Sequence, residues 1–183
     1  MPRHVTRRAD RDDAFREYVA ARADAMRFTA YLLAGDWHTA EDIAQTAFVK
    51  LYLAWDRIDH AGSVDAYMRR IVTRTFLNEH RRGWRQRERL TAEPPEMPAA
   101  ANPMPEQRML IWRALSAVPP KQRAALVLRY WEDLSVTQTA DLLGCSAGTV
   151  KSQCARGLDT LRTVLRQQIG EDADEILTEG ASW

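Results

Sequence analysis

The segment that most constrains how this chain can fold is residues 133–162, which reads DLSVTQTADLLGCSAGTVKSQCARGLDTLR. Ala140 is small enough to lie where two helices cross, Gly144 follows where a tight turn needs a positive φ, and Val150 recurs as an apolar anchor. Ser146 stands at the expected start of a second helix, where serine is a favoured N-cap. This spacing predicts a helix-turn-helix.

A polar face on the second helix of this motif suits the reading of duplex DNA. Val150, Cys154 and Leu158 recur at helical spacing, so the polar residues of the first turns point away from the core. Such a polar first turn enters the major groove in helix-turn-helix proteins. The polar residues are Ser146, Thr149, Lys151, Ser152, Gln153 and Arg156. The open alternative is an ordinary helical hairpin, because glycine ends helices in proteins of every kind.

Length and composition are those of a soluble globular protein. The 183 residues are 45% hydrophobic and 28% charged, which is enough for one medium domain or two small ones. No run approaches the ~18 apolar residues of a membrane span, and the arginine-rich start is not followed by the apolar core of a signal peptide. We therefore expect a cytoplasmic protein with no membrane partner.

Residue types that carry catalytic or metal chemistry are scattered along the chain. The sequence has no glycine-rich phosphate loop, no GxSxG and no carboxylate cluster with a partnering histidine. Cys145 and Cys154 form neither a CxxC nor a metal-ligand spacing, so we interpret both as reduced packing residues. We expect no enzymatic activity, no cofactor and no bound metal.

Charge is distributed unevenly, although the net charge is only +1. Between positions 69 and 89, eight arginines stand against two glutamates, whereas residues 171–183 carry five acidic side chains and no basic one. Within the basic block, intervals of three, four and seven residues place four side chains on one stripe of a helix, called here the arginine stripe: Arg70, Arg74, Asn78 and Arg81. A stripe of this kind suits a phosphate backbone.

Aromatic residues in or beside the arginine stripe suit unpaired bases, which stack on aromatic faces for ~1–3 kcal/mol each. The residues expected to bind single-stranded DNA are Tyr67, Arg70, Arg74, Asn78, Arg81, Arg82 and Trp84. The open alternative is that Tyr67 and Phe76 belong to the core and that the arginines are only solvated.

Apolar residues recur at helical spacing along most of the chain and strand signals are scarce, so we predict an all-α fold. The first block should contain a helix over 14–33 that ends at Gly35, and a third helix over 64–82. Between them, a helix should begin near Thr39, where Thr39 and Asp42 can form a capping box. The apolar faces of these helices are assigned to the core.

The second block should contain helices over 107–118 and 121–131, followed by the helix-turn-helix. Residues 91–106, TAEPPEMPAAANPMPE, hold five prolines and three glutamates and no basic residue, a composition that favours an extended linker. At ~3.1 Å per residue this linker reaches on the order of 50 Å. We therefore expect its flanks to be separate domains.

Together the two blocks resemble an RNA polymerase sigma factor of the extracytoplasmic-function group in the sigma-70 family. Residues 40–55, AEDIAQTAFVKLYLAW, resemble the region 2 helix that docks on the polymerase clamp. Residues 63–88, SVDAYMRRIVTRTFLNEHRRGWRQRE, resemble the promoter-melting helix, and residues 118–162 resemble region 4, which reads the minus-35 promoter element. Two such motifs in this order, separated by a linker, identify the family more specifically than either motif alone.

The resemblance implies a factor that directs promoter-specific transcription initiation, built from two small helical domains. The expected bounds are 10–90 for region 2, 91–107 for the proline-rich acidic linker, 108–170 for region 4 and 171–183 for the acidic tail. The implied partners are core RNA polymerase, through its clamp and flap regions, and promoter DNA, both duplex and single-stranded. An anti-sigma factor is a further partner that the resemblance admits.

Carried over by position, the resemblance assigns roles to individual residues. Polymerase docking falls to Asp42, Gln45, Thr46 and Val49. The loop 59–63 matches the place where the family captures a flipped base of the minus-10 element, and the polar residues of the second helix match minus-35 contacts. Gln153 departs from the arginine that relatives commonly place there, so we expect one interaction with DNA to be absent or exchanged.

Two other functions fit parts of the sequence. A free-standing helix-turn-helix regulator would read two half-sites as a dimer, but it leaves the arginine-rich helix unexplained. A helical protein-interaction adaptor would use that basic helix to bind an acidic partner, and it would not bind DNA even at low salt.

The acidic tail 171–183 also has two interpretations. We expect it to be solvated and partly disordered. The alternative is self-inhibition, in which its acids cover the arginine stripe while Ile176, Leu177 and Trp183 pack on an apolar patch.

Overall fold

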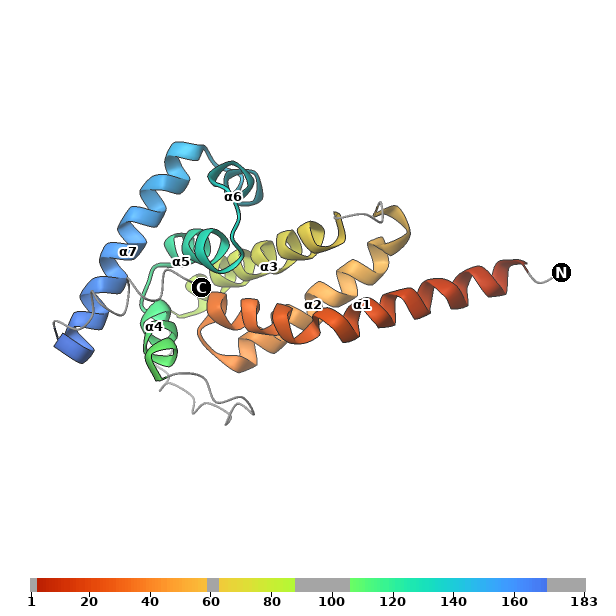
Figure 1. Cartoon of the computed structure of the whole chain (residues 1–183), viewed down its shortest axis with the longest axis horizontal. Coiled ribbons are helices and arrows are strands. Elements are labelled where there is room, and N and C mark those ends of the chain that lie inside the picture. The colour runs from red at the N-terminus through yellow and green to blue at the C-terminus, as the bar shows by residue number, and fades with distance from the viewer. Residues whose placement is uncertain (1–2, 59–62, 88–105, 171–183) are drawn as a thin grey trace.

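The computed structural model describes residues 3–58, 63–87 and 106–170, and these residues form helices and no strand (Figure 1). The first block contains α1 (Arg3–Ala34), α2 (Trp37–Ala54), the 3-10 turn η1 (Trp55–Arg57) and α3 (Ser63–Arg87). The second contains α4 (Glu106–Ser116), α5 (Pro120–Leu126), the π-helical turn η2 (Val127–Trp131), α6 (Val136–Leu143) and α7 (Ala147–Ile169). The prediction of an all-α fold with two helical blocks is confirmed.

The helices α1, α2 and α3 pack side by side, and α1 extends beyond the other two towards the N-terminus (Figure 1). The apolar faces predicted for α2 and α3 lie in their shared core. The buried members are Ile43, Ala47, Leu51, Trp55, Met68, Ile71, Val72, Thr75 and Phe76. Phe48 and Tyr67 are only half-buried and pack at the edge of that core.

The turn between α1 and α2 corrects the predicted start of the second helix. Gly35 ends α1 as expected, with φ of 86°, but the next residue, Asp36, is the N-cap of α2. Its carboxylate accepts a hydrogen bond from the backbone N–H of Thr39 at 2.7 Å. The predicted Thr39–Asp42 capping box is therefore wrong, because Asp36 lies in extended backbone three residues earlier and takes the same N–H group.

The helix-turn-helix forms as its sequence predicts. Gly144 follows α6 in the left-handed conformation, with φ of 65°. Ser146 caps α7, and its hydroxyl accepts a hydrogen bond from the backbone N–H of Thr149 at 3.1 Å. Val150 is fully buried and Cys154 is nearly so, which holds α7 against α5 and α6. The ends of the two helices are thus defined by local caps, and their packing is held by the buried apolar side chains of α7.

Three helices differ in length from their predictions. α1 starts before residue 14, and α3 continues past residue 82 to Arg87. The helix predicted over 121–131 is α only as far as Leu126 and then widens into η2, where the backbone N–H of Glu132 bonds to the carbonyl of Val127 at 3.0 Å. A one-residue widening of this kind does not change the spacing of apolar residues in the sequence enough to be predicted from it.

The two blocks lie against each other. The ring of Phe28, on α1, is 4.6 Å from that of Trp112 on α4 and 5.0 Å from that of Trp131 on η2, centroid to centroid. Buried residues of both blocks form one continuous apolar cluster. Nearly all of the predicted linker 91–107 and the tail 171–183 lie outside the described residues, so their expected conformations stay predictions. None of the described helices is both long and apolar enough to cross a membrane.

Gly157 lies where α7 crosses α5, and replacing it with alanine should destabilise the protein. A Cβ atom at this position would lie 2.9 Å from Cδ1 of Leu126 and 3.3 Å from Cβ of Gln122. Overpacking of this kind costs about 1–3 kcal/mol, which exceeds the gain of up to about 1 kcal/mol in helix propensity.

Gly148 on the same helix is the matched control, because a Cβ atom there meets nothing closer than Oγ of Ser146 at 3.8 Å. Urea denaturation should show Gly157→Ala to be less stable than Gly148→Ala by at least about 1 kcal/mol. Equal stability of the two variants would contradict this packing.

Candidate functional site

One face of α2 is exposed and carries all four residues predicted to dock on the polymerase. Asp42, Gln45, Thr46 and Val49 point away from the buried side of the helix. Val49 is 61% exposed, and Leu53, one turn further along, is 68% exposed. Leu53 was missed by sequence analysis, although its spacing of four residues from Val49 is a signal for a second apolar residue on that face.

A groove of about 1050 Å³ lies between the two blocks beside this face. Asp42, Gln45 and Thr46 line it from α2, and the segment from Ser116 to Pro120, between α4 and α5, lines it from the second block. The predicted docking face therefore borders the junction of the two blocks.

The arginine stripe of α3 lies on its exposed side. Arg70, Arg74 and Asn78 are exposed, one turn apart, while the opposite side of the helix is buried. Tyr67 is half-buried and lies one turn before Arg70. Of the same predicted set, Arg81, Arg82 and Trp84 belong to α3, but their side chains lie outside the described part of the chain.

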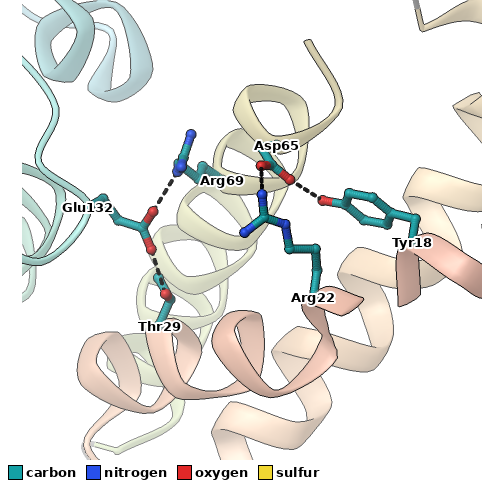
Figure 2. A network of polar contacts seen from close by, with 6 residues as sticks. All are labelled: Tyr18, Arg22, Thr29, Asp65, Arg69 and Glu132. Carbon is teal, nitrogen blue, oxygen red and sulfur yellow. Dashed lines mark hydrogen bonds and ion pairs between the residues drawn. The ribbon is translucent and has the colours of Figure 1, made fainter. Parts of the chain in front are cut away.

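The first turn of α3 is fixed to α1 by Asp65. One oxygen of the Asp65 carboxylate accepts a hydrogen bond from the hydroxyl of Tyr18 at 2.9 Å, and the other pairs with the guanidinium of Arg22 at 2.7 Å (Figure 2). Burial raises the pKa of the Tyr18 hydroxyl, and the bond to Asp65 raises it further. The predicted base-capture loop 59–63 precedes this anchor, and its residues 59–62 lie outside the described residues.

The helix-turn-helix presents its polar residues together. Ser146, Thr149, Lys151, Ser152 and Arg156 are exposed, and Gln153 is half-buried. The hydroxyl oxygens of Ser146 and Thr149 lie 2.9 Å apart, and Ser152 donates a hydrogen bond to the carbonyl of Thr149. The exposed N-terminal turns of α7 thus combine a helix N-terminus, hydroxyls and cations, a combination that suits a nucleic-acid backbone.

Glu132 is a residue whose importance the sequence did not indicate. Its side chain is only 7% exposed and bonds to Arg69 of α3 and Thr29 of α1 (Figure 2). An acidic residue between Trp131 and Asp133 is expected on a surface, so only the three-dimensional packing reveals its position.

The two cysteines are free and belong to the helix-turn-helix. Cys145 is half-buried in the turn, whereas Cys154 faces the core and is 7% exposed. Burial raises the pKa of the Cys154 thiol. Over the described ranges, no group of histidine, cysteine and acidic side chains is arranged to hold a metal ion.

Comparisons with known proteins match both blocks. The family model described as Sigma-70 region 2 matches residues 18–86, and that described as Sigma-70, region 4 matches residues 108–161. The chain is 40% identical over 155 residues to the RNA polymerase sigma-E factor of Streptomyces coelicolor, covering 82% of this chain and 85% of the relative. It is 34% identical over 164 residues to the ECF RNA polymerase sigma factor SigE of Mycolicibacterium smegmatis, covering 86% of this chain and 63% of the relative.

A solved structure shares the helical fold. The sigma factor RpoE from Bartonella quintana, in complex with the anti-sigma factor NepR, is similar with a TM-score of 0.68 at 23% identity. The match covers 84% of this chain and 97% of that chain. At this identity the likeness shows a common fold.

The environments of the two cysteines predict different reactivities. At pH 8 a disulfide reagent such as DTNB should modify Cys145 first and Cys154 at least about tenfold more slowly, because burial and a raised pKa both lower the accessible thiolate of Cys154. The variants Cys145→Ser and Cys154→Ala assign the two phases. Equal rates in the folded protein would contradict the inward orientation of Cys154.

Proposed function

The chain belongs to the extracytoplasmic-function group of the sigma-70 family, and on that premise we propose which of its surfaces bind RNA polymerase and promoter DNA. A sigma factor is not an enzyme: it binds core RNA polymerase and directs it to start transcription at promoters. The observation that carries this function is the presence of regions 2 and 4 in one chain, in this order. A free-standing regulator or a protein-interaction adaptor requires only one of them.

We assign polymerase binding to the exposed face of α2. Val49 and Leu53 supply an apolar centre, and Asp42, Gln45 and Thr46 supply a polar edge. Interfaces commonly combine an apolar centre with a polar rim, and large apolar side chains this exposed gain free energy when a partner covers them. Leu53 is thus added to the docking residues proposed from the sequence.

We assign the single-stranded minus-10 element to α3. Arg70, Arg74 and Asn78 are available to phosphates along one exposed stripe, and Tyr67 offers part of an aromatic face. The stripe continues towards Arg81, Arg82 and Trp84 by sequence spacing alone. The anchor at Asp65 fixes the start of this helix, which favours a defined path for the strand.

We assign the minus-35 element to the exposed turns of α7. Ser146 and Thr149 would contact phosphate near the helix N-terminus, while Lys151, Ser152 and Arg156 would reach into the major groove. The second block is only mildly basic, because its lysines and arginines are partly balanced by acids such as Glu132, Asp133, Asp141 and Asp159, so we expect weak binding of duplex DNA by the free protein. Tethering to polymerase then supplies the effective concentration.

Membership of this family also supports proposals about where the protein acts, how its domains are bounded and which further partner it binds. We propose that the protein acts in the cytoplasm, where RNA polymerase works, with domain bounds of 10–90 and 108–170 on either side of the linker. An anti-sigma factor is a proposed further partner, because the structurally similar RpoE was solved with one.

Replacing both apolar residues of the α2 face should weaken binding to core polymerase without unfolding the protein. Val49→Ser with Leu53→Ser removes the centre of the proposed interface, and loss of such anchors lowers affinity roughly ten- to hundredfold. Binding is measured by fluorescence anisotropy, and Ala25→Ser on the exposed side of α1 is the control. Unchanged affinity would place the docking surface elsewhere.

Run-off transcription with purified core polymerase tests the function itself. Promoter fragments from the source genome should give start-site-specific transcripts that vanish without this protein. Binding of duplex DNA by the protein alone, with no transcript in the presence of polymerase, would favour a free-standing regulator.

The double variant Arg70→Ala/Arg74→Ala should reduce these transcripts at least about tenfold. It should also lower the salt slope of single-strand binding by about 0.7 for each phosphate that the protein no longer neutralises. Arg16→Ala/Arg113→Ala removes the same charge from exposed positions of α1 and α4 and should leave transcription unchanged. An equal effect of both double variants would show that only net charge matters, and it would contradict the assignment of the minus-10 element to α3.

A further inference from the structure

A small apolar pocket opens beside α7 in the second block. Its volume is about 190 Å³, and α1, α4, α5, η2 and α7 all contribute to its lining. Leu158 and Leu161 line it from α7, and every described side chain of the lining is aliphatic except those of Tyr130, Trp131 and Arg162. Tyr130 is 41% exposed, so the pocket adjoins the surface at that ring. Aliphatic walls offer water few hydrogen bonds, and an apolar side chain that displaces this water therefore gains free energy.

The end of α7 lies close to this pocket. α7 ends at Ile169, about 12 Å beyond Leu161 along the helix axis. The next residue, Gly170, has φ of 75° and ψ of −141°, a conformation that glycine adopts far more readily than other residues. The chain therefore leaves the axis of α7 at Gly170.

The segment after Gly170 is long enough to return to the pocket. Ile176 and Leu177 are the only large aliphatic residues among positions 171–183. Six extended residues, 171–176, span about 20 Å at ~3.3 Å each. This reach exceeds the distance back to Leu161, so the aliphatic pair can arrive at the pocket without any change in α7.

Charge also favours a return along α7. Residues 160–169 hold Arg162 and Arg166, both exposed, and no acidic residue, whereas residues 171–183 hold five acidic residues and no basic one. Arg162 pairs with Asp159 at 3.5 Å, and an ion pair this exposed is held weakly. An acidic segment that runs back along α7 therefore meets opposite charge at the rim of the pocket.

We propose that residues 171–183 are an internal ligand of the second block: they fold back along α7, and Ile176 and Leu177 occupy the apolar pocket. Short tethers give effective concentrations in the mM range, so a weak contact of two side chains is enough to keep the pocket filled. This site differs from that of the sequence hypothesis, in which the tail covers the arginine stripe of α3.

The docked tail has a defined consequence for the surface of the second block. The pocket meets α7 from Leu158 onwards, beyond Arg156, so the residues assigned to the minus-35 element stay exposed. An apolar partner that uses the pocket must first displace the tail. The tail therefore limits access to this surface and leaves the DNA-reading turns free.

Disulfide formation within the full chain tests where the tail lies. In a Cys145→Ser/Cys154→Ala background, Thr178→Cys places a thiol directly after the aliphatic pair, and Tyr130→Cys places one at the pocket. The matched control pairs Thr178→Cys with Thr163→Cys, because Thr163 is exposed on α7 within reach of the tail but does not line the pocket.

In a glutathione redox buffer, the equilibrium constant for the disulfide between positions 130 and 178 should exceed that between 163 and 178 at least about tenfold. A tail that only samples solvent would form both disulfides to the same extent. Equal constants would therefore overturn the proposal.

Charges placed on the aliphatic pair provide the specific disruption. Ile176→Asp with Leu177→Asp should abolish the preference for position 130, because carboxylates are not stable in an aliphatic pocket. Ala173→Asp with Ala181→Asp adds the same charge to the same segment and keeps the aliphatic pair, so the preference should remain. An equal loss in both double variants would show that charge alone positions the tail, and it would overturn the pocket as its site.

Thermal unfolding gives a second test that needs no introduced cysteine. In the otherwise unsubstituted chain, Ile176→Asp with Leu177→Asp should lower the Tm by at least about 2 °C, whereas Ala173→Asp with Ala181→Asp should leave it unchanged. An unchanged Tm in the first double variant would overturn the proposal. Neither test involves polymerase or DNA, so a negative result leaves the proposed function untouched.

Discussion

The carboxylate of Glu132 determines how the two halves of this molecule lie together, because a charge removed from water can lie only where both oxygens find donors. Thr29 and Arg69 provide these donors from two different helices. The π turn η2 brings the carboxylate to them: one extra residue rotates the following side chains by about 100° relative to a regular α-helix. Without that turn Trp131 would also leave Phe28, so one local change of backbone geometry positions both the polar and the aromatic parts of the junction.

The exposed surfaces follow from this packing. The last turns of α1 are buried by both blocks, and α2 and α3 bury their apolar faces in the same core. Among the faces left exposed are the apolar pair Val49 and Leu53 on α2 and the arginine stripe on α3. We assign these two faces to polymerase and to the unpaired strand, and we assign the polar turns of α7 on the second block to duplex DNA. Function therefore depends on faces that the core leaves unused.

Local signals in the sequence predicted the elements well but not their association. Gly144 ends the first helix of the helix-turn-helix and Ser146 caps the second, both by short-range rules of backbone conformation and capping. The geometry of this motif could therefore be predicted without a structure. The start of α2 was misplaced because two acceptors, Asp36 and Thr39, were available within one turn and the earlier one caps the helix. The junction could not be predicted, since Glu132 and Arg69 are far apart in the chain and each is an ordinary surface residue by type. The roles of Asp42, Arg70 and Lys151 rest on family resemblance and exposure, and their tests are biochemical.

Hydrogen exchange of the full chain, free and bound to core RNA polymerase, tests whether the exposed face of α2 is the docking surface, because it reports backbone protection segment by segment. We predict that backbone amides of α2 become more protected when polymerase binds. Unchanged protection of α2 in the complex would contradict the assignment of polymerase docking to this helix.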